Sequence, residues 1–227
     1  MKVALFDIDG TLLHAHGAGR RALSRALAAE TGIQDLDRGY LFDGKTDPQI
    51  IRDLLQRAGR HDSPERVTSV CRRYVTLLVE ELPRGPAPEA LPGVPRLLDA
   101  LERESGVLLG LLTGNLRDGA RLKLEAAGIG HARFRVGAYG SDALERGDLP
   151  SFARERATAV LGREVLASDL VIIGDTPADV DCGRGAGTTT IAVATGRFDA
   201  ATLTASGADH VFRSLEDVRS VVAAILG

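Results

Sequence analysis

Apolar positions along the chain follow two different patterns, and the change between them divides the sequence. Short segments that are apolar throughout, each followed by a polar turn, alternate with amphipathic segments from about residue 94 onward. One further segment of this kind opens the chain at residues 3–8. Between them, residues 15–82 carry apolar residues only at helical spacing. Fully apolar strands separated by helices indicate a parallel sheet that is covered on both faces.

The same pattern predicts individual elements. Strands are predicted at residues 3–8, 107–112, 134–136, 170–173, 189–193 and 210–212. Helices are predicted at residues 94–101, 117–127, 150–161, 177–186 and 215–226. Within residues 15–82, one helix ends at Gly32, a second begins at Asp47 and a third begins after Ser63. We expect Asp47 to be the N-cap of the second helix, with Pro48 in its first turn.

The order of these segments predicts an inserted domain. The first strand precedes the helical block and every other strand follows it, so the block leaves and re-enters an α/β core. We expect the core to comprise residues 1–14 and 83–227, and the helical insertion to comprise residues 15–82. Residues 13–17 and the segment Pro83–Pro95 would connect the two, and the five prolines of the second connection make it stiff.

Composition and charge narrow the class of protein. With 227 residues, of which 44% are hydrophobic, the chain suits one core domain with a modest insertion. The formal net charge of −3 shows no basic excess, so we expect no nucleic acid and no anionic membrane as a partner. The apolar segments are far shorter than the roughly 20 residues that span a bilayer. The first one stops at Asp7, too early for a signal peptide, so we expect a soluble, cytoplasmic protein.

The basic residues are almost all arginine. Of the 28 basic residues, only Lys2, Lys45 and Lys123 are lysine, which leaves 25 arginines. No lysine follows Lys123 in the chain. A function that needs a lysine in the C-terminal half is therefore excluded unless an arginine takes its place.

Polar turns follow three of the predicted strands. They are Asp7-Ile8-Asp9-Gly10-Thr11, Thr113-Gly114-Asn115 and Gly174-Asp175-Thr176-Pro177-Ala178-Asp179. Open parallel sheets bind ligands at the carboxyl ends of their strands, so turns on neighbouring strands would share one crevice. That crevice would hold four carboxylates, which repel one another unless a cation neutralises them. Hard oxygen ligands that leave positions open for water and phosphate select Mg²⁺.

The two acids of the first turn can take two different roles. Asp7, at the strand tip, can attack as a nucleophile, and Asp9 can act as general acid and base from the other side of the reacting group. Gly10 lets the backbone approach a ligand closely, and N–H groups of its turn can bind an anion. At the next strand end, Thr113 offers a hydroxyl, and two backbone amides follow it, from Gly114 and Asn115.

These turns resemble the motifs of a known family. The segment 7–12 resembles the first motif of the haloacid dehalogenase-like (HAD) superfamily, residues 113–115 resemble its second motif, and residues 174–179 resemble its fourth. The resemblance covers nearly the whole chain, and the helical block lies where the family has a small helical cap. The layout is most similar to the phosphoglycolate phosphatase branch. The resemblance implies a Rossmann-like three-layer α/β/α core with a parallel sheet and an inserted α-helical cap domain.

The resemblance also implies a role for each polar residue. Asp7 would form an aspartyl-phosphate, and Asp9 would protonate the leaving alcohol and then activate water. Mg²⁺ would be bound by Asp7, the backbone carbonyl of Asp9 and Asp175, with Asp179 as a further ligand or as a support behind them. Thr113 and the amides after it would hold the phosphoryl oxygens. Splitting a very slow hydrolysis over a covalent intermediate and neutralising its charge with a metal are both expected devices.

The third motif of the family departs from its usual form here. The family usually has a lysine that neutralises the nucleophile and the phosphate, but this chain has no lysine in that region. We predict that Arg146 takes the role, because it lies in the loop before a predicted helix, about where the motif belongs. Arg154 and Arg156, one turn into that helix, are the alternatives. Arginine stays charged and binds a carboxylate or phosphate in a different geometry from lysine.

Two residues of the expected cap are candidates for substrate contact. Lys45 is the only lysine of the cap and lies in the loop before its second helix. Arg21 lies at the start of the first cap helix and could reach the leaving group. For both residues the alternative is a solvated charge at a helix start.

The sequence therefore predicts a magnesium-dependent phosphatase that hydrolyses a small phosphomonoester. A phosphosugar mutase of the β-phosphoglucomutase type has the same core motifs, and a phosphonate hydrolase would need Lys45 to form a Schiff base. A haloacid dehalogenase lacks an acid at the position of Asp9. A non-catalytic binding module would have lost one of the four acids. The sequence singles out neither the phosphate ester nor the oligomeric state.

Overall fold

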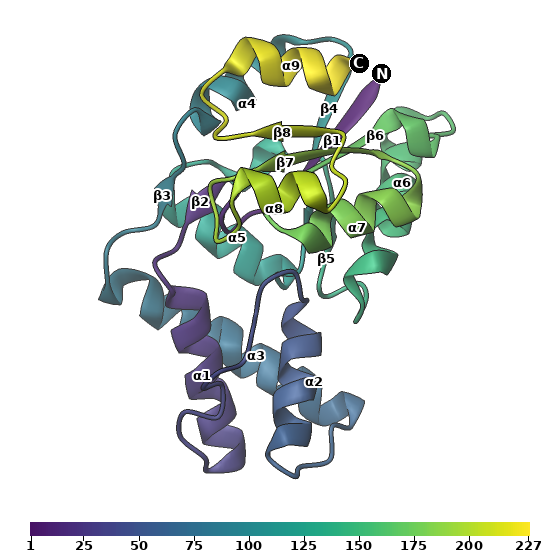
Figure 1. Cartoon of the computed structure of the whole chain (residues 1–227). Helices are drawn as coiled ribbons and strands as arrows, with labels where there is room; N and C mark the ends of the chain where they lie inside the picture. The colour runs from purple at the N-terminus through teal and green to yellow at the C-terminus, as the bar shows by residue number, and fades with distance from the viewer.

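An α/β core with a six-stranded parallel sheet makes up most of the computed structural model, which describes all 227 residues (Figure 1). The strand order is β5-β4-β1-β6-β7-β8, so β1 lies between β4 and β6. The strands are β1 (Lys2–Phe6), β4 (Val107–Thr113), β5 (Val136–Tyr139), β6 (Leu170–Gly174), β7 (Thr189–Val193) and β8 (His210–Phe212). The parallel sheet with an inserted helical domain, expected from the sequence, is confirmed.

Helices cover both faces of this sheet. The helices on one face are α4 (Val94–Arg103), α5 (Arg117–Ala126) and α9 (Val218–Leu226). Those on the other face are α6 (Leu149–Leu161) and α7 (Pro177–Ala186), and the short α8 (Ala200–Ala205) packs beside β7 and β8. The core therefore has three layers, in the order helices, sheet, helices.

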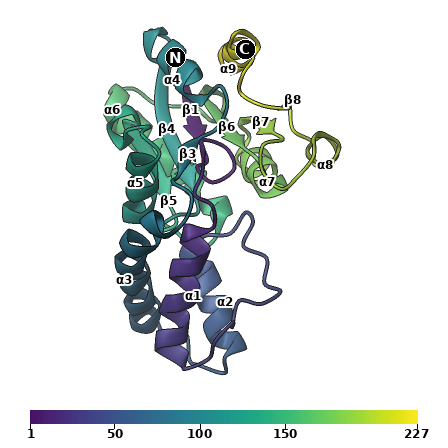
Figure 2. The same cartoon turned by 90° about the vertical axis from the view of Figure 1, so that its left-hand side faces the viewer.

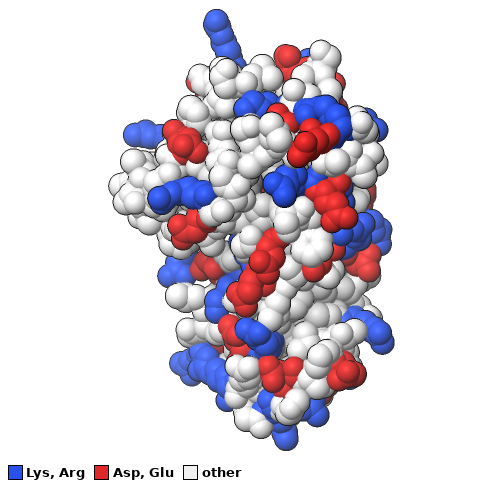
Figure 3. All heavy atoms as spheres, turned by 90° about the vertical axis from the view of Figure 1, so that its right-hand side faces the viewer, with Lys and Arg blue, Asp and Glu red and all other residues white.

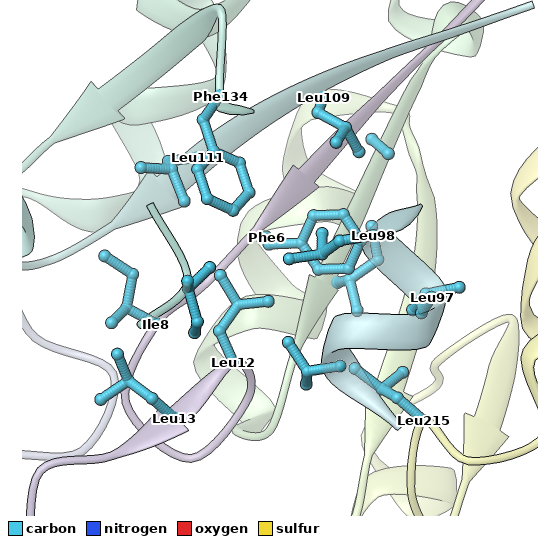
Figure 4. Close-up of a cluster of buried hydrophobic side chains, with 14 of the residues drawn as sticks. Phe6, Ile8, Leu12, Leu13, Leu97, Leu98, Leu109, Leu111, Phe134 and Leu215 are labelled. Atoms are coloured by element: carbon cyan, nitrogen blue, oxygen red, sulfur yellow. The ribbon is translucent and has the colours of Figure 1, made fainter. Parts of the chain in front are cut away.

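Alternate residues of β1 supply two separate apolar cores. Ala4 and Phe6 face the larger cluster, together with side chains of α4, α5 and α9 (Figure 4). Val3 and Leu5 face the cluster beneath α6. All four side chains are fully buried, and burying a side chain of the size of Phe6 or Leu5 contributes roughly 1.5–3 kcal/mol. Because both faces of the strand are covered, it is apolar at every position from Val3 to Phe6.

Three helices form the insertion, which we call the cap. They are α1 (Ala18–Thr31), α2 (Asp47–Arg57) and α3 (Pro64–Glu81). The cap has its own apolar cluster, in which Leu27, Leu54 and Leu78 are fully buried. It stands at one end of the sheet, whereas both chain termini lie at the opposite end of the core (Figure 1). Of the three helices, α3 packs against α5 of the core (Figure 2).

The two connections between core and cap are paired with each other. A short strand β2 (Leu13–His14) lies antiparallel to β3 (Glu89–Ala90), with Leu13 opposite Ala90. The sequence indicated a stiff proline-rich connection but not this pairing, because two-residue strands leave no periodic pattern. The pairing joins the two connections into one ribbon, so the cap is attached to the core by a single two-stranded hinge.

The start of the second cap helix differs from the sequence prediction. Thr46, not Asp47, is the N-cap of α2, and its Oγ accepts a hydrogen bond from the N–H of Gln49 at 3.2 Å. The prediction that Asp47 caps this helix is therefore wrong. Its carboxylate instead accepts a hydrogen bond of 2.8 Å from the N–H of Leu116, in the core. Asp47, which local sequence predicts as the N-cap, thus forms a contact between cap and core instead.

Two other elements begin later than predicted, and one short helix was not predicted. The strand predicted at residues 134–136 begins only at Val136, because the preceding residues His131–Arg133 form a 3₁₀ turn that ends at Phe134. The last helix begins at Val218 rather than at residue 215, because Asp217 caps it through a hydrogen bond from Ser220. The short helix α8 had no sequence signal long enough to predict it.

Charged side chains of both signs are intermixed on the surface. Figure 3 shows one face of the molecule, on which lysine and arginine alternate with aspartate and glutamate and no large region of one sign stands out. The helices of the chain are all too short or too polar to cross a bilayer.

Candidate active site

The three polar turns lie side by side at the carboxyl edge of the sheet. β1 is hydrogen-bonded to β4 on one side and to β6 on the other, with Phe6 opposite both Leu111 and Ile173. The turns that follow these three strands line one cavity of about 430 Å³ beneath the cap. The convergence predicted from the sequence is therefore present, and it comes from the neighbouring positions of the three strands.

Three buried carboxylates form a cluster at this cavity, and two of them, Asp7 and Asp175, line it. Asp7, Asp175 and Asp179 each offer a carboxylate oxygen, and these oxygens all lie within 4.8 Å of one another. Burial, together with the charges of Asp179 and Asp9, raises the pKa of Asp7 to about 6 against the opposing effect of Arg146. Burial, together with the charges of Asp7 and Asp179, holds the pKa of Asp175 well above its usual value. Such a cluster favours a cation.

Arg146 is the arginine that meets these acids. Its Nη2 lies 3.2 Å from Oδ1 of Asp7 and also binds Oδ1 of Asp179, and its side chain is only 8% exposed. It begins a 3₁₀ turn, Arg146–Asp148, that leads into α6. Burial lowers the pKa of the guanidinium, but the charges of Asp179 and Asp7 outweigh it and keep the group protonated. Its buried Nε has no hydrogen-bond partner.

The alternatives to Arg146 lie away from the acids. Arg154 is exposed on α6. Arg156 is held elsewhere, because its guanidinium binds the carboxylate of Asp142 and the backbone carbonyl of Gly137. Of the three arginines considered from the sequence, only Arg146 lines the cavity.

Asp9 faces the cavity from the same turn as Asp7. Its Oδ2 accepts two hydrogen bonds, one of 2.8 Å from Nδ2 of Asn115 and one of 2.6 Å from Nζ of Lys123. From the sequence, Asn115 was expected to contribute its backbone amide. In the structure that amide donates to Oγ1 of Thr113 at 3.3 Å, and the side chain of Asn115 holds Asp9.

Lys123 is a residue of the site that the sequence analysis missed. It lies on α5 with a side chain only 6% exposed, and its ammonium contacts Asp9 and Asn115. A signal was present, because Gly119, Ala120, Lys123 and Leu124 form one face of a predicted helix, and that face is apolar except for the lysine. A lysine on the buried face of a helix needs acceptors, and here the strand turns supply them.

Gly10 and Gly114 serve the site through their missing side chains. The N–H of Gly10 donates to the carbonyl of Leu13 at 2.9 Å, so it is used within the turn. A Cβ at Gly10, whose φ is +84°, would overlap the carboxylate of Asp175. At Gly114, a Cβ would overlap the backbone carbonyl of Lys45, which shows how closely the cap loop approaches this strand end.

Comparison with known proteins agrees with this geometry. The family model described as haloacid dehalogenase-like hydrolase matches residues 4–184, which is well over half of the chain. The chain belongs to this family. As a HAD-like hydrolase it has three strand-end turns in the order that the resemblance implied, with a helical cap between the first and the second.

Curated relatives of this HAD-like hydrolase carry phosphatase names. Phosphoglycolate phosphatase of Rhodospirillum rubrum is 30% identical over 95% of this chain and 90% of its own length. Validoxylamine A 7'-phosphate phosphatase of Streptomyces hygroscopicus subsp. limoneus is 27% identical over 96% of each chain. Among solved structures, CbbY from Rhodobacter sphaeroides in complex with phosphate superposes with a TM-score of 0.75 at 21% identity, over 96% of each chain. That match shows a shared fold.

The donor set of this HAD-like hydrolase suits a divalent cation. Three buried carboxylates face one guanidinium, so the site carries an uncompensated negative charge, which adds to burial in raising the pKa values of Asp7 and Asp175. All the donors are hard oxygens, which Mg²⁺ prefers. The carboxylate of Asp179 is already used, because Oδ1 binds Arg146 and Oδ2 accepts from the N–H and hydroxyl of Thr176.

The cap supplies the opposite wall of the cavity. Lys45 lines it, with its ammonium 2.7 Å from the hydroxyl of Tyr40 and 2.9 Å from Oδ2 of Asp53. Arg20 lines it too and is paired with Asp37.

The expectation that Arg21 lies in the site is wrong. Arg21 is outside the cavity lining, and its guanidinium binds the carboxylate of Glu81, a buried acid at the end of α3. It also donates to the backbone carbonyl of His16 at 2.7 Å. On a helix, adjacent residues point in directions about 100° apart, and here Arg20 faces the cavity while Arg21 faces Glu81.

Proposed function

We propose that this HAD-like hydrolase is a magnesium-dependent phosphomonoesterase that acts on a small phosphorylated molecule through an aspartyl-phosphate on Asp7. The observation that carries the proposal is the position of Asp7 within one buried cluster with Asp175, Asp179 and Arg146, at a cavity that also exposes Asp9. A nucleophile, a cation site and a proton donor then surround one reacting phosphorus atom.

In the first step, a carboxylate oxygen of Asp7 forms a bond to phosphorus while the bond from phosphorus to the ester oxygen breaks. Asp9 gives its proton to the departing oxygen, which leaves as an alcohol. In the second step, water attacks the phosphorus of phosphorylated Asp7 and passes a proton to Asp9, so that inorganic phosphate is released and both acids return to their starting state.

The positive charges of the site would hold the phosphoryl group. Arg146 contacts Asp7 and would balance the charge of the incoming phosphate, while the hydroxyl of Thr113 and the N–H of Gly114 would donate to phosphoryl oxygens. Asp7, Asp175 and the backbone carbonyl of Asp9 would hold Mg²⁺, and Asp179 would support Arg146 from behind. Bound Mg²⁺ would neutralise charge on the phosphoryl oxygens and align them for in-line attack.

We also propose that residues 15–82 act as a cap that closes over the site, with residues 1–14 and 83–227 as the catalytic core. The loop before α2 supports this division, because the N–H of Asp47 donates to the carbonyl of Gly114 at 2.8 Å and Oγ1 of Thr46 donates to the carbonyl of Leu144 at 2.5 Å. The relatives carry phosphatase names, and the cavity of about 430 Å³ suits a small organic phosphate.

A phosphate-release screen over small phosphomonoesters tests the proposal. We expect release by the wild type in Mg²⁺, loss of release in EDTA, and loss in the D7N variant. The panel includes phosphoglycolate and a hexose 1-phosphate, and the products are identified, because a mutase would return the phosphate on the sugar. Release that continues in EDTA, or at the wild-type rate in D7N, would contradict the proposal.

A further inference from the structure

Lys123 and Asp9 form a contact that joins helix α5 to the catalytic turn. The ammonium of Lys123 lies 2.6 Å from Oδ2 of Asp9 and 2.6 Å from Oδ1 of Asn115. Nδ2 of Asn115 reaches the same Oδ2 of Asp9 at 2.8 Å, so the three side chains form a closed triangle. The lysine side chain is almost fully buried, whereas that of Asp9 is 43% exposed toward the cavity.

The two oxygens of Asp9 are therefore unequal. Oδ2 accepts from two donors, one of them charged, and is held by both. Oδ1 accepts no hydrogen bond from any group of the chain. A carboxylic acid that must give and take a proton needs one oxygen free to meet the substrate, and this arrangement leaves Oδ1 in that position.

The cap covers the ammonium from the other side. A side chain at Gly19 of α1 would begin 3.1 Å from Nζ of Lys123 and 3.5 Å from the hydroxyl of Tyr74 on α3, so the lysine fits because residue 19 is a glycine. The positive charge of Lys123 also opposes the rise in the pKa of Asp47 that burial causes. The charged and titratable groups that face Asp9 and Lys123 are thus Asp7 from the core and Asp47 and Tyr74 from the cap.

We propose that Lys123 is a positioning residue for the general acid and base. It fixes Oδ2 of Asp9, so that Oδ1 exchanges the proton with the ester oxygen and then with water, and the closed cap completes the surroundings of its ammonium. This inference rests on the proposed function, in which Asp9 is the acid and base. No step of the reaction runs through the lysine nitrogen itself.

Substituting Lys123 by methionine tests this role. Met matches the length of the lysine stem and removes only the charged donor. We expect K123M to lower kcat by about 100-fold, the cost of misplacing a catalytic group by about 1 Å, with KM changed by less than about threefold.

Two further variants make the test decisive. K2M removes a lysine that donates to the carbonyl of Ser168, far from the cavity, and should keep wild-type kinetics. K123R keeps the charge but moves it, so its kcat should stay at least about tenfold below that of the wild type, within the range of acid–base catalysis. If K123M does not unfold cooperatively, it is not properly folded, and the kcat of K123R alone tests the role of Lys123. A wild-type kcat in K123M or K123R would overturn the proposal.

The contact is also measured without turnover, which separates this inference from the proposed function. If the wild type hydrolyses no phosphomonoester, the proposed function fails. Thermal unfolding then tests the contact between Lys123 and Asp9 independently. D9A should lower Tm more in the wild-type background than in K123M. In the wild-type background it removes an acceptor from the buried ammonium of Lys123, whereas K123M has no ammonium to lose one. An equal loss of Tm in the two backgrounds would show that Lys123 does not hold Asp9.

Discussion

Nη2 of Arg146 lies 3.2 Å from Oδ1 of Asp7, whose carboxylate we propose as the nucleophile. The same guanidinium binds Asp179, whose other oxygen accepts from Thr176. Asp179 therefore holds the guanidinium of Arg146 in contact with Asp7. In a chain with no lysine after residue 123, this arginine is the cation that the site has available at this strand end.

Removing Arg146 should cost both activity and stability. R146M leaves Asp7 and Asp179 as buried charges without an oppositely charged partner, so we expect a loss of about 3–5 kcal/mol in the free energy of unfolding. We expect kcat/KM to fall by at least about 100-fold, the effect of losing one preorganised donor at the reacting group. R154M, which removes an exposed arginine of α6, is the control and should behave as the wild type. Wild-type turnover in R146M would exclude Arg146 from the site.

Magnesium should stabilise the folded protein through Asp175. A ligand that binds only the folded state raises its stability, so Tm should rise with Mg²⁺ concentration in the wild type. D175N removes one proposed ligand and should abolish most of that rise. D181N removes an exposed carboxylate on α7, near Asp179 in sequence, and should respond to Mg²⁺ as the wild type does. An equal rise in D175N would place the cation elsewhere.

A side chain at Gly114 should prevent the cap from closing. A Cβ there would overlap the carbonyl of Lys45, while the φ of residue 114 is ordinary and needs no glycine. We expect G114A to fold, with kcat/KM lower by about 100-fold because the cap loop cannot seat over the site. G185A, whose Cβ would meet nothing within 4 Å, is the matched control. The expected loss is about 100-fold. If kcat/KM of G114A lies within about threefold of that of G185A, this loop does not dock as described.

The stability contributed by Asp47 should depend on pH. Burial raises its pKa from 3.8 to about 6 in the folded protein, so the folded state binds its proton more tightly than the unfolded state. Its contribution is therefore greatest at low pH and declines as pH rises through about 6. D47N cannot titrate but keeps an acceptor for the N–H of Leu116. Its Tm relative to the wild type should increase from pH 5 to pH 7, and a constant difference would show that Asp47 does not titrate in this range.

The sequence predicted the parts of the site that local pattern controls. Apolar strands followed by polar turns placed Asp7, Thr113 and Asp175 at strand ends, and parallel pairing brought those ends together. Arg146 was predicted by its place in the order of motifs. The predictions of the strand ends rest on periodicity and turn chemistry, which a short stretch of sequence contains in full, whereas that of Arg146 rests on the resemblance to the family.

The residues that the sequence did not predict depend on contacts between distant segments. Lys123 reaches Asp9 across 114 positions, so the apolar face of its helix indicates a buried lysine but does not identify Asp9 as its partner. Asp47 leaves the helix end for an N–H of the core, and Arg21 turns to Glu81 at the end of α3. In each case local sequence predicts one position for the side chain, but the side chain contacts a buried group of a distant segment instead. The buried contact is the more favourable of the two.

Covalent capture of the phosphoryl group on Asp7 tests the central claim most directly. An aryl phosphate with a good leaving group needs no proton from Asp9 in the first step, so the D9N variant should form the aspartyl-phosphate and hydrolyse it slowly. Rapid acid quenching and peptide mapping should then find the phosphoryl group on the peptide that contains Asp7, in D9N and not in D7N. Phosphate release by the wild type with no phosphoryl group on Asp7 in D9N, and with full activity in D7N, would contradict the account.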